Sequence, residues 1–292
     1  MNGFLVVDKT GGMTSHDVVA KIRKRFGTKK VGHAGTLDPM ATGVLVIGLG
    51  NATRLLQYVT DGTKAYNGTI RLGSATHTDD REGDEILRAA PADLAAVTEE
   101  DIHQYLAAMV GTIKQRPSSV SAIKIDGKAA HQRIREGESV DIPEREVTIT
   151  SIDIKNILRS ESAIDIEIEV ICSAGTYIRS IARDLGDRLG VGGHLTTLRR
   201  TLVSPFTLDE AAPWESAEAI DTAAGISRLF PARTLNFDEM LEISHGRFLA
   251  PNETAGLVVA LSPQGGFAAL LENKDISGKL LATPSLVAPQ SE

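Results

Sequence analysis

The sequence has few of the residues that build metal sites, disulfides and membrane spans. Its one cysteine, Cys172, excludes a disulfide framework and a cysteine-rich zinc site. Its seven histidines are scattered singly, without a spacing such as H-E-x-x-H. The longest apolar run, residues 43–50, is far shorter than the roughly 20 residues that span a bilayer. Because the first ten residues lack a basic segment, we expect no secretory signal peptide, and we expect a cytoplasmic protein without a metal.

The charge is small overall but unevenly distributed. The net charge is -7, and residues 201–292, with five basic and twelve acidic residues, account for all of it. Two segments of the neutral remainder are basic: residues 21–30 hold six basic and no acidic residues, and residues 111–135 hold six basic residues against Asp126. Local basic segments, rather than the overall isoelectric point, attract a polyanion. Both segments are candidate nucleic-acid contacts, with ordinary solvated surface as the alternative.

Hydrophobic patterning predicts alternating strands with fewer helices and no doubly wound pattern. Strands are expected at residues 4–7, 44–49, 66–72 and 164–170, the last with strict alternation of apolar and acidic side chains. Glycine-rich residues 31–42 are expected to be a loop. No G-x-G-x-x-G sequence follows a strand, which argues against a dinucleotide-binding fold.

Three helices are expected from capping residues and apolar spacing. They cover about residues 15–26, 99–110 and 177–189, with N-caps at Thr14 or Ser15, Thr98, and Thr176. Alanine-rich residues 213–233 are expected to hold a domain boundary. Beyond them, two apolar runs flank a P-Q-G-G turn at residues 263–266, which predicts a hairpin in a small β-rich C-terminal domain.

The densest chemical signal is the segment GHAGTLDPMATG at residues 32–43. Its glycines, proline and threonines disfavour regular structure, and Pro39 biases the preceding Asp38 away from helical dihedrals. A carboxylate on a loop between two apolar strands can point into a cleft. The alternative is an Asp-Pro turn in which Asp38 only accepts hydrogen bonds from its own backbone.

Residues 32–45 closely resemble the motif G-H-x-G-x-L-D-P-x-A-[TS]-G-x-L of the TruB family of tRNA pseudouridine synthases. Other segments resemble the same family in order and spacing over about residues 1–210: the N-terminal strand and lysine turn at 3–15, K-x-Y at 64–66, an RNA-clasping insertion at 117–137, G-T-Y-I-R and D-L-G at 175–186, and L-R-R at 198–200. The resemblance implies a mixed α+β fold, with a pseudouridine synthase catalytic domain around a largely antiparallel sheet at residues 1–235 and the insertion at about 114–142. It also implies a small β-rich, PUA-like C-terminal domain at residues 236–292.

The implied reaction is the isomerisation of uridine-55 in the T arm of tRNA. The base is detached at N1, rotated and rejoined through C5, so neither a cofactor nor a metal is expected. The expected partner is tRNA, without a membrane or a guide RNA, and we expect a monomer. The target base has to be extruded from the T loop, and the basic segments are expected to supply phosphate contacts that offset this cost.

Asp38 matches the family's catalytic aspartate. It would either attack C1′ or remove the C2′ proton to give a glycal, and the sequence leaves both routes open. A carboxylate in a water-excluding cleft needs a compensating cation. Arg179 is the candidate, because the first turn of a helix disfavours a cation and a nearby anion would explain its position.

Five further positions match the family pattern. Tyr66 would stack on the flipped uracil, and its hydroxyl is a candidate for proton transfer at C5. Tyr177 and Leu198 match positions that contact the target base. His33 matches a residue that packs against RNA beside the vacated stack, and Lys9 would support the loop that holds Asp38. The alternatives are an ordinary strand tyrosine, a core leucine and a surface histidine.

Two departures and three rival functions accompany this interpretation. Thr10 stands where the family often has proline, and the acidic C-terminal region argues against strong phosphate binding there. The rivals are an RNA-binding or RNA-chaperone protein without catalysis, a guide-RNA-dependent synthase, and an aspartate-dependent hydrolase of glycosidic bonds. The last usually needs two carboxylates, and no second acid stands beside a comparable motif.

Overall fold

A computed structural model describes residues 2–118, 124–125, 128–129 and 142–288. Most of the expected insertion, including Arg133 and Arg135, lies outside the described residues. The described part of the insertion includes two short strands that pair with each other, β8 (Lys124–Ile125) and β9 (Lys128–Ala129). None of the described helices has the length and apolarity needed to cross a membrane.

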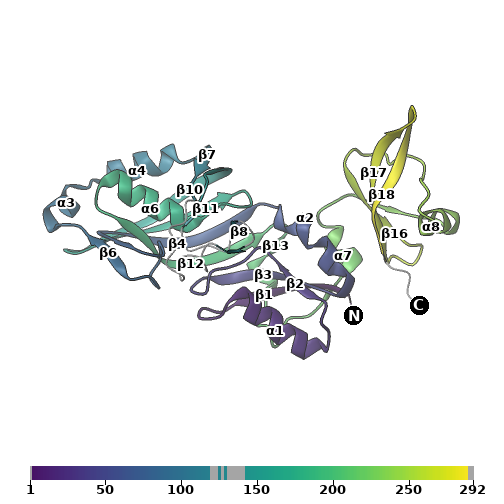
Figure 1. The fold of residues 1–292 in the computed structure, drawn as a ribbon, viewed down its shortest axis with the longest axis horizontal. Helices are drawn as coiled ribbons and strands as arrows, with labels where there is room; N and C mark the ends of the chain where they lie inside the picture. The colour runs from purple at the N-terminus through teal and green to yellow at the C-terminus, as the bar shows by residue number, and fades with distance from the viewer. Residues whose placement is uncertain (1, 119–123, 126–127, 130–141, 289–292) are drawn as a thin grey trace.

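One large mixed sheet forms the body of the protein (Figure 1). Its strands pair in the order β14-β1-β3-β12-β4-β11-β10-β7, with β2 on β3 and β13 on β12. Their bounds are β1 (Gly3–Lys9), β2 (Val31–Ala34), β3 (Thr42–Leu49), β4 (Lys64–Leu72), β7 (Gly111–Gln115), β10 (Arg145–Arg159), β11 (Ile164–Cys172), β12 (Gly193–Val203), β13 (Phe206–Thr207) and β14 (Ile220–Asp221). Apart from β3 with β12, these pairings are antiparallel, as the alternating sequence patterns predict.

The sheet consists of two halves that meet at a short seam. The first half contains β14, β1, β3 and β2, and the second contains β12, β4, β11, β10 and β7. At the seam β3 and β12 pair at two positions, Thr42 with Arg199 and Gly43 with Arg200. Gly43 has φ +98°, and a Cβ at this position would lie 2.1 Å from the carbonyl oxygen of Arg200. A glycine is therefore required for the two halves to meet.

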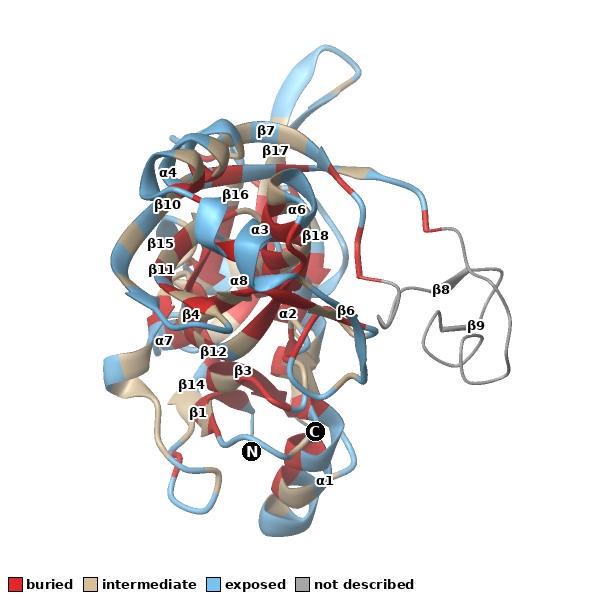
Figure 2. Ribbon diagram, turned by 90° about the vertical axis from the view of Figure 1, so that its left-hand side faces the viewer, coloured by how far each residue is buried: buried red, intermediate tan, exposed pale blue. Residues whose placement is uncertain are grey.

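Helices cover one face of each half and bury a common core (Figure 2). This layer consists of α1 (Ser15–Phe26), α4 (Glu99–Ala108) and α6 (Ile178–Leu189), with the short α3 (Pro91–Ala96) beside the strand pair β5 (Ser74–Thr76) and β6 (Glu85–Arg88). The capping boxes at Thr14 and Thr98 are confirmed, and Gly27 ends α1 in the left-handed conformation. On the other face, a second core lies under η1 (Gly50–Leu55), α2 (Leu56–Thr60) and α7 (Thr222–Ile226).

Two of the sequence predictions are wrong in detail. Residues 31–34, expected as loop, form β2, because Val31 to Ala34 pair in antiparallel register with Leu49 to Val46 of β3. Thr176 does not cap α6. Its hydroxyl donates to the carbonyl oxygen of Ser173 at 3.0 Å, and Tyr177 occupies the N-cap position. No side chain of the described residues caps α6, and the backbone N–H of Tyr177 donates to Oε1 of Gln115 on β7 at 2.8 Å, which anchors the start of the helix.

The C-terminal region forms a separate four-stranded sheet (Figure 1). Its order is β15 (Ala232–Thr234), β16 (Leu257–Leu261), β17 (Phe267–Ile276) and β18 (Lys279–Val287), and the hairpin expected around residues 263–266 joins β16 to β17. The short helix η2 (Leu208–Glu210) precedes this sheet in the chain, and α8 (Phe237–Ser244) lies between β15 and β16. Buried Val259, Leu270 and Leu286 belong to the same core as Phe4 and Val6 of β1, so this sheet packs on the first half of the large sheet.

Candidate active site

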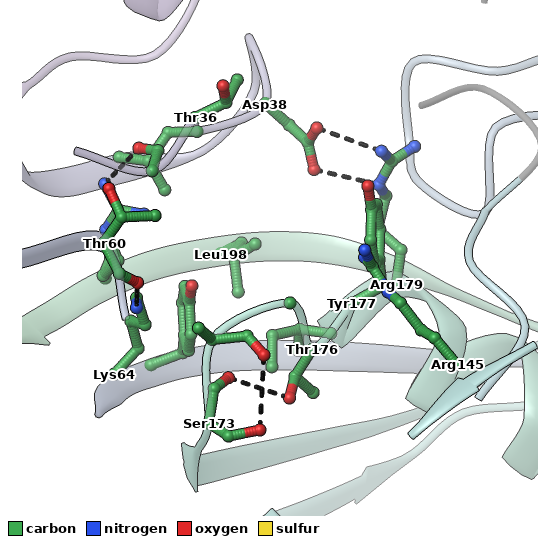
Figure 3. Close-up of a pocket in the computed structure, with 17 residues that line it drawn as sticks. Thr36, Asp38, Thr60, Lys64, Arg145, Ser173, Thr176, Tyr177, Arg179 and Leu198 are labelled. Carbon is green, nitrogen blue, oxygen red and sulfur yellow. Dashed lines mark hydrogen bonds and ion pairs between the residues drawn. The ribbon is translucent and has the colours of Figure 1, made fainter. Parts of the chain in front are cut away.

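A cavity of about 320 Å³ opens beside the seam of the large sheet (Figure 3). Its walls come from the loop at residues 35–38, from β4 and β12, and from the loop at residues 173–178 that leads into α6. Five of the residues singled out from the sequence line it: Asp38, Tyr66, Tyr177, Arg179 and Leu198. The fold therefore gathers into one place residues from four separate segments of the chain.

Asp38 and Arg179 face each other across this cavity with a two-pronged contact (Figure 3). Nη2 of Arg179 donates to Oδ1 of Asp38 at 3.0 Å, and Nε lies 2.9 Å from Oδ2. The Arg179 side chain is almost fully buried, whereas that of Asp38 keeps 31% of its surface exposed, toward the cavity it lines. This arrangement leaves the carboxylate within reach of a ligand while a rigid fork fixes its orientation.

A second layer of contacts holds Arg179 in place. Its Nη1 donates to the carbonyl oxygen of Thr78 at 2.8 Å and to the hydroxyl of Ser118 at 3.3 Å, and it lies 3.4 Å from Oδ2 of Asp80. Asp80 is itself buried and accepts hydrogen bonds from Thr78 and from the backbone of Glu82. The segment at residues 76–82 thus forms the back wall of the site.

The pKa of the Asp38 carboxyl is raised by burial, which disfavours the charged form. The neighbouring Asp80 charge raises it further, while Arg179 and Lys9 lower it. The two-pronged contact with Arg179 is the main interaction that opposes this rise and favours the ionised form of Asp38. The structure thus places an anion beside the cation in the first turn of α6, where the helix dipole disfavours a cation.

Lys9 lies beneath the loop that carries Asp38, outside the cavity. Its Nζ donates to the carbonyl oxygens of Thr10, Met13 and Pro39 at 3.0, 2.6 and 3.2 Å. Burial lowers the pKa of the lysine to about 8. Because Pro39 follows Asp38 directly, these contacts tie the catalytic loop to the end of β1, which is the supporting geometry expected of Lys9.

His33 is not brought to the cavity. It lies on β2, with its ring edge-on to that of His16 at 5.4 Å between centroids. Burial lowers the pKa of His33 to about 4, and its Nδ1 is buried without a hydrogen-bond partner among the described residues. A contact between this imidazole and RNA remains a prediction.

Tyr66 and Leu198 form the floor of the cavity. They stand on the adjacent strands β4 and β12 and are both buried. Burial raises the pKa of the Tyr66 hydroxyl, and the neighbouring Arg200 opposes this shift. The hydroxyl is therefore protonated at neutral pH.

Two buried cations that line the cavity were missed in the sequence analysis. Arg200 is almost completely buried and donates to the carbonyl oxygens of Val44 at 2.8 Å and Gly35 at 3.0 Å. Nζ of Lys64 donates to the carbonyl oxygens of Thr60 and Gly62, and burial lowers its pKa to about 8. Both residues lie in segments that resemble family motifs, K-x-Y and L-R-R, but neither position carries a local pattern that reveals its contacts.

The basic segment at residues 21–30 is partly used within the protein. Arg25 donates to the carbonyl oxygens of Trp214 and Ala217, Nζ of Lys21 lies 4.6 Å from the centre of the Trp214 ring, and Arg23 donates to Val31. Lys24, Lys29 and Lys30 are exposed. The charge available to a polyanion on this surface is therefore smaller than the sequence suggests.

The described residues contain no group of three or more His, Cys, Asp and Glu side chains that could hold a metal ion. The cavity instead combines a fixed carboxylate, paired guanidinium groups and aromatic rings. Such a set can orient a planar base and present a nucleophile or a base to a sugar carbon.

Comparison with known proteins identifies the family. The model of the TruB family pseudouridylate synthase N-terminal domain matches residues 23–178, and that of the tRNA pseudouridylate synthase B C-terminal domain matches residues 179–224. Among curated relatives, tRNA pseudouridine synthase B of Corynebacterium diphtheriae is 52% identical, covering 99% of this chain and 97% of the relative. The protein of the same name from Leifsonia xyli is 50% identical, covering 93% and 92%.

Solved structures support the fold. A Cbf5-Nop10-Gar1 complex and an H/ACA RNP bound to a substrate RNA containing 2′-deoxyuridine each include a chain that matches with a TM-score of 0.69. Each match has 24% sequence identity and covers 98% of this chain and 84% of the other. The matched family models and the curated relatives, which extend over nearly the whole sequence, show that this chain belongs to the TruB family of pseudouridylate synthases.

Proposed function

We propose that the protein isomerises uridine to pseudouridine in tRNA, with uridine-55 of the T arm as its target. The observation that carries the proposal is the Asp38 carboxylate, held by Arg179 in a cavity whose floor includes an aromatic ring. Membership of the TruB family, and relatives that carry the name tRNA pseudouridine synthase B, support the same reaction and substrate.

The reaction is balanced without an oxidant or a reductant. The N1–C1′ bond breaks, the C5–C1′ bond forms, C5 loses a proton and N1 gains one. In the proposal Asp38 either bonds to C1′ or takes the C2′ proton, and both roles require its ionised form. Tyr66 stacks on the flipped uracil and is the candidate for proton transfer at C5, while Tyr177 and Leu198 hold the base.

The proposed partner is tRNA alone, without a guide RNA or a membrane, in the cytoplasm, and the enzyme acts as a monomer. The target base leaves the T-loop stack at a cost of a few kcal/mol, which contacts to shape and phosphate offset. Exposed Lys24, Lys29 and Lys30 are candidate phosphate contacts. The C-terminal sheet, proposed as a PUA-like domain at residues 236–292, contributes little positive charge.

The test uses an unmodified tRNA transcript and no additives. After incubation, carbodiimide treatment and primer extension map each pseudouridine. We expect a single stop at uridine-55 with the wild type, none with Asp38→Asn, and an unchanged stop with Asp187→Asn, which alters an exposed aspartate on α6. A bound but unmodified tRNA would overturn the proposal in favour of an RNA-binding protein, and release of free uracil would indicate a hydrolase.

A further inference from the structure

Arg145 is the first residue of β10 and lines the cavity beside Tyr177 (Figure 3). Its guanidinium carbon lies 4.7 Å from the centre of the Tyr177 ring, a cation–π distance. The strand holds it firmly, because Arg145 pairs with Gln115 of β7, the same residue whose side chain binds the backbone of Tyr177. The guanidinium and the ring are thus fixed by one local framework.

Among the cavity's cations, Arg145 alone has no oxygen partner in the described part of the chain. Lys64 and Arg200 donate to backbone carbonyls, and Arg179 contacts carboxylates. The Nε of Arg145 is buried and makes no hydrogen bond there. A guanidinium carries five N–H donors, and a buried donor without an acceptor costs free energy. The guanidinium, which lines the cavity, therefore offers its remaining donors to an oxygen-bearing ligand.

The loop opposite leaves room for that ligand. Gly175 has φ +85°, and a Cβ at this position would lie 3.7 Å from the guanidinium carbon of Arg145. A larger side chain here would cover the guanidinium, whereas glycine leaves it facing the cavity. The base-binding floor is already supplied by Tyr66 and Leu198, and Arg179 is already paired with Asp38.

We propose that Arg145 binds a phosphodiester oxygen of the RNA next to the flipped uridine, and that it does so while stacked on Tyr177. The inference rests on the proposed function, because a flipped nucleotide carries its two flanking phosphates to the mouth of the cavity. A guanidinium fork matches the geometry of phosphate oxygens, and a rigid stack loses little side-chain freedom on binding.

The experiment measures how tRNA affinity depends on salt. An unmodified tRNA transcript is titrated in an Asp38→Asn background, which blocks turnover, with and without Arg145→Gln. Loss of one phosphate contact is expected to raise Kd roughly 10-fold and to reduce the slope of log K against log salt by about 0.7 to 0.9. Arg145→Lys keeps the charge and is expected to keep most of the slope.

The matched control is Arg159→Gln, which removes the same charge from the exposed far end of the same strand. We expect its slope to stay at the reference value. With Asp38 intact, Arg145→Gln is expected to raise the tRNA concentration that gives half the maximal single-turnover rate roughly 10-fold, because losing a phosphate contact weakens binding.

Three results would overturn the proposal. One is an unchanged slope in Arg145→Gln, which would indicate a neutral partner such as a uracil carbonyl. The second is an equal change in Arg159→Gln. The third is a large loss of single-turnover rate without a change in Kd, which would mean that Arg145 acts only by positioning Tyr177. A wild type that forms no pseudouridine, with the slope difference intact, refutes the proposed function but leaves the phosphate contact standing.

Discussion

The guanidinium of Arg179 meets both carboxylate oxygens of Asp38, at 2.9 and 3.0 Å, although 141 positions separate the two residues in the chain. One residue belongs to a loop of the first half of the sheet and the other to a helix on the second. The contact therefore favours the ionised form of the carboxylate and joins the two halves at the candidate active site.

Arg179→Gln is expected to shift the acid limb of the pH–rate profile to higher pH. Arg179 lowers the Asp38 pKa, while burial and Asp80 raise it, so the pKa rises further without the guanidinium. The ionised fraction then falls most at low pH. We expect a rate loss of roughly 100-fold near neutral pH and a larger one below it. Single-turnover rates on the tRNA transcript across pH measure this.

Asp80→Asn serves as the comparison for that variant. The charge of Asp80 raises the Asp38 pKa, so removing that charge is expected to move the acid limb to lower pH. The rate is expected to fall as well, because Arg179 loses a carboxylate neighbour. If the acid limbs of Arg179→Gln and Asp80→Asn shift in the same direction, this electrostatic account is contradicted.

Lys9→Met is expected to lower both stability and rate. The substitution leaves three carbonyl oxygens, those of Thr10, Met13 and Pro39, without their shared donor. We expect a loss of about 2–4 kcal/mol in the free energy of unfolding and a reduced turnover number with a similar KM. Urea unfolding and steady-state kinetics provide the two measurements, and an unchanged unfolding midpoint would argue against the anchoring role.

His33→Gln is expected to make the protein less sensitive to acid. Burial lowers the pKa of His33 from about 6.5 to about 4, so between these values the unfolded chain binds a proton that the folded protein excludes. His33 therefore costs no stability above pH 6.5, and its cost grows as the pH falls toward 4, to at most about 3 kcal/mol. Unfolding free energies at several pH values should show a shallower slope in the variant. An equal slope of unfolding free energy against pH in the two proteins would show that a group other than His33 titrates.

Gly43→Ala is expected to prevent normal folding of the catalytic body. The added Cβ would lie 2.1 Å from the Arg200 carbonyl oxygen, and the positive φ disfavours alanine in any case. Gly246→Ala is the control, because its φ is also positive but nothing lies within 4 Å of the added carbon. We expect a loss of several kcal/mol at position 43 and about 1 kcal/mol at position 246, measured by thermal unfolding.

The sequence predicted those features that depend on neighbouring residues. The capping box of Thr14, the alternation in residues 164–170 and the hairpin at residues 263–266 are local patterns, and each was found. Residues 31–34 were missed because only their partner strand β3 makes them a strand. The cap expected at Thr176 is absent for the same kind of reason, because the start of α6 is anchored by Gln115 of the distant strand β7.

The residues of the candidate site also divide into those that the sequence predicted and those that it missed. Asp38, Tyr66, Tyr177, Arg179 and Leu198 were found through motif resemblance, and the structure brings them together. Arg145 and Asp80 were not, because their partners lie far away in the chain and their own neighbourhoods look like surface charge. Long-range pairing of this kind leaves no periodicity for a sequence argument to use.

The short seam between β3 and β12 has a consequence for experiments on folding. Neither half of the sheet alone contains both Asp38 and Arg179, and the halves pair at only two positions. Catalytic activity therefore reports on the docking of the halves and not merely on their separate formation. During refolding, the return of turnover should lag behind the return of circular dichroism.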